Sequence, residues 1–146
     1  NGFDQVLWLD AHEHRYIEEV GTMNIFFVMD GVLVTPKLGG TILPGITRDS
    51  VIKLARHWDM PVEERRIHIE EIISAGRDGR LEEVFGAGTA AVIAPVDEVH
   101  HDGESVTFDI DSRGPVGQRL YDTITGIQHG RVEDPFDWAH PIKIDE

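Results

Sequence analysis

Residues 24–35 read Asn-Ile-Phe-Phe-Val-Met-Asp-Gly-Val-Leu-Val-Thr, and this stretch decides the fold that we predict. It holds two apolar runs separated by the dipeptide Asp30-Gly31. Asp-Gly between two such runs is a strong signal for a two-residue hairpin turn. The stretch therefore predicts a β-hairpin with strands over residues 24–29 and 32–35.

Upstream of this hairpin, Gln5 to Leu9 is a short apolar run that predicts a buried strand. Polar residues from Asp10 to Arg15 predict a surface turn, and extended structure is expected to resume at Tyr16. Because the strand that precedes this turn is predicted to be buried, we expect Trp8 in the core.

Downstream of the hairpin, apolar residues recur at helical spacing after the tight loop that holds Gly39-Gly40. They are Val51, Ile52, Leu54, Ala55 and Trp58. The pattern predicts an amphipathic helix over residues 47–59 with Trp58 in the core, and Pro61 ends it. A strand over 62–67 and a second helix over 69–75 are expected to follow.

The last third of the chain predicts further strands and one more helix. Strands over 82–85 and 91–96 are expected to flank a loop at Gly86-Ala87-Gly88-Thr89, and Asp102-Gly103 is a second hairpin turn. The final helix is expected to start at Pro115 and to end before Gly130. This alternation predicts an α/β domain with a mixed sheet. A tail over 133–146, in which Trp138 would dock, is expected to be partly disordered.

Composition narrows the possible functions. A formal charge of −14, from 27 acidic and 13 basic residues, argues against nucleic acid and anionic membranes as partners. No apolar run approaches the roughly 20 residues that span a bilayer, and no signal segment opens the sequence, so a cytoplasmic location is expected. With no cysteine, disulfides and thiolate ligands are excluded. Because the sequence opens on Asn1 and soon enters a strand, we expect it to be part of a longer chain.

Two turns are candidates for binding an anion. In Leu43-Pro44-Gly45-Ile46-Thr47, the amides of Ile46 and Thr47 would lie at the positive end of the predicted helix. Gly86 to Ala90 offers a second set of amides and the Thr89 hydroxyl. For either turn taken alone, a helix cap or a hairpin turn is a better explanation than an anion site.

An acidic pair, Glu18-Glu19, enters an apolar strand through Gly21. Its composition is that of a strand start with solvated charges. If one carboxylate faced a pocket, it could hold a heterocyclic nitrogen protonated, which is the support that a pyridoxal cofactor needs as an electron sink.

The order of these motifs resembles the branched-chain amino-acid aminotransferases, which are fold-type IV pyridoxal-phosphate enzymes. Five segments carry the resemblance: Val6 to Leu9, Glu19 to Asn24, Leu43 to Arg48, Glu83 to Ala90, and Thr125 to Gly130. The resemblance implies an α/β fold, the larger C-terminal domain of such an enzyme, with a mixed sheet and flanking helices that form part of a pseudo-barrel. Residues 1–132 would be this cofactor-holding domain and residues 133–146 its tail.

The resemblance also implies roles for individual residues around pyridoxal 5'-phosphate. Glu19 would pair with the pyridine nitrogen, and Thr22 would lie near the cofactor. Gly45 would shape the turn whose amides, from Ile46 and Thr47, bind the phosphate.

The second turn would serve both cofactor and substrate. Gly88 would help to bind the cofactor, and the Thr89 hydroxyl would contact its phosphate. The amides of Thr89 and Ala90 would bind the α-carboxylate of the substrate.

No catalytic residue is assigned, because the family's Schiff-base lysine has no counterpart in this sequence. Lys37, Lys53 and Lys143 are the only lysines, and none lies in the family's Lys-x-Gly-Gly-Asn-Tyr context. We therefore expect that lysine to precede Asn1 in a longer chain, and we expect the isolated chain to be inactive.

The implied reaction is transamination of leucine, isoleucine and valine with 2-oxoglutarate by a homodimer or larger assembly. Ala91 and Ala94 replace the redox-active Cys-x-x-Cys of mammalian mitochondrial members, which favours a bacterial type. A D-amino-acid aminotransferase, an aminodeoxychorismate lyase and a non-catalytic cofactor-binding module remain as alternatives. His12, His14, His100 and His101 are interpreted as solvated, so no metal site is predicted.

Overall fold

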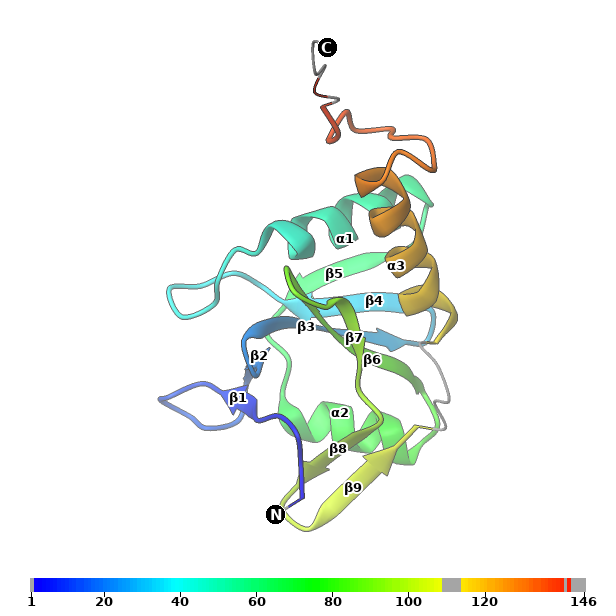
Figure 1. Cartoon of the computed structure of the whole chain (residues 1–146). Helices are drawn as coiled ribbons and strands as arrows, with labels where there is room; N and C mark the ends of the chain where they lie inside the picture. Colours follow the sequence, from blue (N-terminus) through cyan, green and yellow to red (C-terminus); the bar gives the residue numbers. More distant parts are fainter. Residues whose placement is uncertain (1, 109–113, 141, 143–146) are drawn as a thin grey trace.

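A computed structural model describes residues 2–108, 114–140 and 142 of the chain (Figure 1). The strands and helices in these ranges follow one another in the order β1 (Leu7–Leu9), β2 (Ile17–Val20), β3 (Met23–Met29), β4 (Val32–Pro36), α1 (Ile46–His57), β5 (Val62–Arg65), α2 (Ile69–Arg77), β6 (Leu81–Gly88), β7 (Val92–Pro95), β8 (Glu98–His101), β9 (Glu104–Thr107) and α3 (Pro115–Gln128). None of these helices is long and apolar enough to cross a bilayer.

Strand β3 is the centre of a seven-stranded sheet. One of its edges pairs with β6 from Asn24 to Met29. The opposite edge is shared by β2, which pairs at Met23 and Asn24, and by β4, which pairs from Phe27 onward. Strand β5 runs parallel to β4, whereas the other pairs are antiparallel. The predicted hairpin and the predicted mixed sheet are therefore confirmed.

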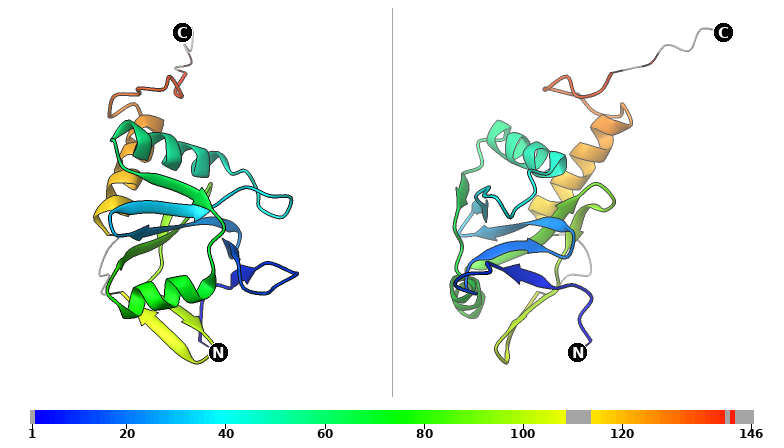
Figure 2. Two further views of the ribbon diagram at one scale, coloured as in Figure 1. Left: turned by 180° about the vertical axis from the view of Figure 1, so that it is seen from behind. Right: turned by 90° about the vertical axis from the view of Figure 1, so that its left-hand side faces the viewer.

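Strand β3 is covered on both faces. Ile25, Phe27 and Met29 belong to the apolar cluster formed with α2. Phe26 and Val28 belong to a second cluster formed with α1 and α3. Figures 1 and 2 show α2 on one side of the sheet and α1 with α3 on the other. Burial on both faces explains why this strand is uniformly apolar instead of alternating.

The predicted loop at residues 86–89 is wrong. Strand β6 continues to Gly88 and pairs with β7 through Gly88 and Val92, so that the turn begins at Thr89. The glycines make room for a neighbouring side chain. A Cβ on Gly86 would lie 2.9 Å from Cε of Met23, and one on Gly88 would lie 3.0 Å from Cγ of Met23.

The prediction that Trp8 lies in the core is also wrong. Strand β1 is an edge strand that pairs with β2 alone, and Trp8 is 52% exposed. Its indole Nε1 donates a hydrogen bond to the carbonyl of Gly21 at 3.0 Å. Trp58 is half-buried beside the α1 and α3 cluster, with the Arg119 guanidinium 3.8 Å from its ring centre. The predicted core position is therefore correct only for Trp58, and only in part.

Near the C-terminus, the described residues match the predicted last helix and the predicted docking of Trp138. Helix α3 starts at Pro115, and Gly130 takes a positive φ of 64° after it. In the tail, Trp138 stacks on Phe136 at 4.6 Å, and both pack against the α1 and α3 cluster. Lys143 and most of the last six residues lie outside the described residues.

Helix α3 is fixed to the sheet by a buried carboxylate. Glu83 on β6 is 8% exposed and accepts hydrogen bonds from the backbone amides of Val116 at 2.8 Å and Gly117 at 2.9 Å. The N-cap residue, Gly114, offers no side-chain cap. Glu83 therefore provides, from the sheet, the acceptor that the first turn of this helix needs.

Replacing this carboxylate should destabilise the protein. We predict that Glu83→Ala lowers the free energy of unfolding by about 1–3 kcal/mol, because one buried and one part-buried amide lose their acceptor. Glu82→Ala, at the exposed neighbouring position, is the matched control; it removes one exposed hydrogen bond, from the Gly31 amide at 3.0 Å, and should change this free energy by about 0.5 kcal/mol. Urea unfolding of the purified protein measures both. Equal losses would show that Glu83 does not hold the helix.

The turn between β1 and β2 is organised by Asp10. Its carboxylate accepts hydrogen bonds from the backbone amides of Tyr16 at 2.9 Å, Glu13 at 2.8 Å and Arg15 at 3.1 Å. These donors, led by the Tyr16 amide, hold the pKa of the Asp10 carboxyl well below its usual range. The turn therefore depends on an ionised Asp10 and leads directly into β2.

A pH titration tests this turn. Because the pKa of Asp10 is lowered by folding, its stabilising contribution is complete above the unfolded value of about 4 and is lost as the pH falls further. The urea midpoint of the native protein should exceed that of Asp10→Ala by a constant amount near neutral pH. The difference should shrink below about pH 4. A difference that stays the same at low pH would contradict this assignment.

Candidate functional site

Three segments with predicted site residues meet at one end of β3. Glu19 on β2 pairs with Asn24 on β3, and Asn24 pairs in turn with Ala87 on β6. The turn after Gly88 therefore lies near the same strand end as Glu19. Figure 1 shows the β6–β7 turn and the start of α1 at this side of the molecule.

The loop between β4 and α1 is tied to this strand end by side chains. Oε1 of Glu19 accepts a hydrogen bond from the Leu43 amide at 2.9 Å. Nδ2 of Asn24 donates to the Leu43 carbonyl, also at 2.9 Å. The Thr41 hydroxyl donates to Oε1 of Glu18 at 2.7 Å. Glu18 and Glu19, expected as an acidic pair, thus both hold the loop that precedes α1.

Helix α1 starts with amides that are free to bind an anion. Gly45 is its N-cap and provides no side-chain cap. Among the residues that the structure describes, none accepts a hydrogen bond from the amide of Ile46 or Thr47. Ile46 is 86% exposed. Unpaired amides at a helix N-terminus suit a phosphate group, and the phosphate-binding role of Ile46 and Thr47 stays a prediction.

Arg48 anchors the start of α1 to the neighbouring strands. Its side chain is 5% exposed, and Nη2 donates to the Pro36 carbonyl and to Oε1 of Glu64, both at 3.0 Å. Arg56 reaches the other oxygen of Glu64 at 3.0 Å. Burial raises the pKa of the Glu64 carboxyl, but hydrogen bonds from Arg48 and Arg56 outweigh it and hold that pKa below its usual value. The first turn of α1 is therefore fixed to β4 and β5.

The second predicted turn presents exposed groups beside Met23. Thr89 and Ala90 follow β6 directly and are exposed, and Thr22 is exposed in the turn before β3. The close approach of Gly88 to Met23 brings the two turns together. The structure thus gathers Thr22, Gly88, Thr89 and Ala90 at one place, while their roles stay predictions.

Sequence reasoning missed two residues of this site. The sequence places Asn24 in the predicted strand and in the segment Glu19 to Asn24 but gives it no role of its own, although a polar residue that opens an apolar run was a usable signal. Arg48 was read only as part of the turn motif. A charged residue on the inward face of an amphipathic helix was the corresponding signal, since charges are seldom buried without a partner.

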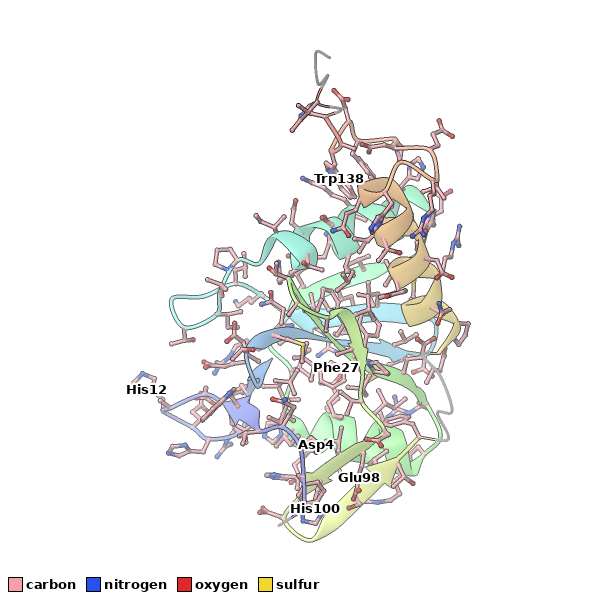
Figure 3. The ribbon with its side chains drawn as sticks, in the orientation of Figure 1. Asp4, His12, Phe27, Glu98, His100 and Trp138 are labelled. Atoms are coloured by element: carbon pink, nitrogen blue, oxygen red, sulfur yellow. The ribbon has the colours of Figure 1, made fainter. Side chains whose placement is uncertain are left out.

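Other candidate sites receive no support. No group of three or more His, Asp or Glu side chains suited to a metal ion occurs in the described part of the chain. Figure 3 shows His12 and His100 on different parts of the molecule. A cavity of about 340 Å³ lies beside Glu83 and Pro115, away from Glu19. A smaller hollow of about 150 Å³ adjoins Glu18 and Thr41. The candidate site is therefore an open strand end, and it lies outside the cavity beside Glu83.

Comparisons with known proteins show which family the chain resembles. The family described as amino-transferase class IV matches residues 1–99. Branched-chain-amino-acid aminotransferase 2 of Bacillus subtilis (strain 168) is 57% identical over 141 residues, which cover 97% of this chain and 39% of that protein. The chain thus spans well under half the length of this relative.

Solved structures of aminotransferases share the fold. The Escherichia coli branched-chain amino acid aminotransferase superposes with a TM-score of 0.77 at 37% identity, over 94% of this chain and 42% of that chain. An aminotransferase from Brucella abortus bound to the co-factor PLP has a TM-score of 0.68 at 28% identity, over 88% of this chain and 40% of its own. The predicted α/β class with a mixed sheet is confirmed, whereas closure into a pseudo-barrel stays a prediction.

Proposed function

The chain belongs to the class IV aminotransferase family, and from this premise we propose that it is the cofactor-holding part of a pyridoxal-phosphate enzyme. That enzyme would transfer amino groups between leucine, isoleucine or valine and 2-oxoglutarate. The 57% identity to a branched-chain aminotransferase supports the substrate class. The observation that carries the proposal is the hydrogen bond from the Leu43 amide to Glu19, which joins a carboxylate to the turn at the start of α1.

The residues present suit the two ends of pyridoxal phosphate. Oε1 of Glu19 is held by Leu43, and Oε2 has no hydrogen-bond partner among the described residues, so this oxygen is free for a ring nitrogen. The unpaired amides of Ile46 and Thr47 suit the phosphate. The cofactor, when bound, supplies an electron sink for the carbon that loses a proton.

Each residue then has a defined task. Glu19 keeps the pyridine nitrogen protonated, which maintains the electron sink. Gly45 shapes the phosphate turn, and the Thr89 hydroxyl at the end of β6 adds a further donor. The amides of Thr89 and Ala90 orient the α-carboxylate of the amino acid. The lysine that forms the covalent bond would come from a part of the enzyme that this sequence does not include.

Two kinds of alternative function, another enzyme of the same fold type and a non-catalytic module, differ from this proposal in testable ways. A D-amino-acid aminotransferase or an aminodeoxychorismate lyase would use the same carboxylate and phosphate turn with a different substrate. A non-catalytic module would bind the cofactor without turnover. A homodimeric state and a cytoplasmic location, both expected from the resemblance, belong to the same proposal and stay predictions.

Activity of the full-length enzyme tests the proposal. With pyridoxal phosphate and 2-oxoglutarate, it should convert L-leucine, L-isoleucine and L-valine, and it should leave D-alanine unchanged. Production of glutamate, measured for each amino acid, gives the substrate profile. Preference for D-alanine would favour a D-amino-acid aminotransferase, and cofactor binding without turnover of any of these amino acids would favour the lyase or the non-catalytic module.

A single substitution tests the role of Glu19. In the full-length enzyme, Glu19→Gln should lower kcat about 10²-fold or more, because glutamine cannot stabilise a protonated ring nitrogen with a negative charge. Glu18→Gln is the matched control, since Glu18 bonds the same loop through Thr41. Its kcat should stay within about twofold of the native value. Similar losses in the two variants would argue against a ring partner at Glu19.

A further inference from the structure

Both backbone groups of Leu43 are hydrogen-bonded to side chains on the paired strands β2 and β3. Its amide donates to Glu19 on β2, and its carbonyl accepts from Asn24 on β3. Glu19 and Asn24 are direct cross-strand partners. The two peptide groups that flank Leu43 are therefore fixed to one short, rigid segment of the sheet.

Asn24 is a buried polar residue. It is 5% exposed and begins a run of apolar residues in the central strand. A buried amide in such a place is costly unless it is hydrogen-bonded, and its Nδ2 bonds the Leu43 carbonyl. Its other terminal atom, Oδ1, lies 2.3 Å from the position that a Cβ on Gly45 would take. Asn24 thus supports both Leu43 and the N-cap of α1.

This support connects the two parts of the candidate site. Gly45 immediately precedes the amides of Ile46 and Thr47, and Leu43 is bonded to Glu19. Without Asn24, the loop over residues 37–45 would retain Glu19 and Glu18 as its side-chain anchors to β2. The position of the phosphate turn relative to Glu19 would then be less closely defined.

We propose that Asn24 is a positioning residue, which sets the phosphate-binding turn of α1 at the correct distance from Glu19. This inference rests on the proposed function, because it assumes that the two places bind the two ends of one cofactor. Asn24 itself touches neither end. It acts through Leu43 and Gly45.

The test uses the full-length apoenzyme and two ligands, pyridoxal phosphate and pyridoxal, which lacks the phosphate. Asn24→Ala should raise the dissociation constant for pyridoxal phosphate about tenfold, because the turn loses its buried donor. The constant for pyridoxal should change by less than about twofold. Fluorescence titration of the apoenzyme measures both constants without any turnover.

Thr35→Val is the matched structural control. Thr35 is fully buried on β4, and its hydroxyl donates to the Ile25 carbonyl at 2.7 Å, which is the same type of bond on the same central strand. Its loss should lower the melting temperature. The ratio of the two dissociation constants should stay at the native value, because this bond does not reach the turn.

A double-mutant cycle tests the contact between Asn24 and Gly45 directly. Gly45→Ala should weaken pyridoxal phosphate binding about tenfold, since the new Cβ overlaps Oδ1 of Asn24. In the Asn24→Ala background the overlapping atom is absent, so Gly45→Ala should cost less than about twofold. Gly40→Ala, where a Cβ meets nothing within 4 Å, should be neutral in both backgrounds.

The outcomes separate this inference from the proposed function. Equal losses for pyridoxal phosphate and pyridoxal, or strictly additive effects of Asn24→Ala and Gly45→Ala, would overturn the positioning role while native binding persists. A native enzyme that binds no pyridoxal phosphate would overturn the proposed function itself. If Asn24→Ala does not fold, Asn24→Asp carries the same comparison, because it keeps the shape and lacks the donor when ionised.

Discussion

One edge of strand β3 pairs with two different strands, β2 and β4, and this division of the edge determines where the site can form. The edge pairs with β2 at Asn24 and with β4 from Phe27, so the two neighbours separate between these residues. A buried backbone carbonyl in such a gap needs a partner, and the Thr35 hydroxyl supplies it to Ile25. At the same place the loop after β4 approaches β2, within reach of Glu19 and Asn24. The site therefore lies at a built-in division of the sheet.

The surrounding fold makes this division rigid. Apolar clusters cover both faces of β3, and buried charged side chains attach the helices to the sheet. Glu83 holds the first turn of α3, and Arg48 holds the first turn of α1 against Pro36 and Glu64. In both cases a charge is buried with hydrogen-bonded partners, which is the condition under which such burial is tolerated. The anion-binding amides of α1 thus start from a fixed base, although the protein as a whole carries a charge of −14.

Local sequence signals predicted the elements but not their contacts. The Asp30-Gly31 turn and the helical spacing after Gly45 are short-range patterns, and the structure confirms both. Gly86 and Gly88 were misread as a loop, because their small size serves the packing of Met23, which is far away in the sequence. Trp8 was misplaced because a short apolar run does not reveal whether a strand is central or at an edge. The Leu43 amide donates to Glu19 across 24 residues, and Asn24 donates to the Leu43 carbonyl across 19 residues, so no local sequence pattern predicts either hydrogen bond.

The exposed apolar side chains around Glu19 follow from the same arrangement. Trp8 is the cross-strand partner of Glu19, and Leu43 is bonded to it, yet these two side chains are 52% and 67% exposed. Single exposed apolar residues are common, but here both belong to residues that pair or hydrogen-bond with Glu19. A ring bound at Glu19 that covered either side chain would displace water from its surface. Because charges interact more strongly where water is excluded, the carboxylate would then act on the ring nitrogen with more effect than its open position suggests.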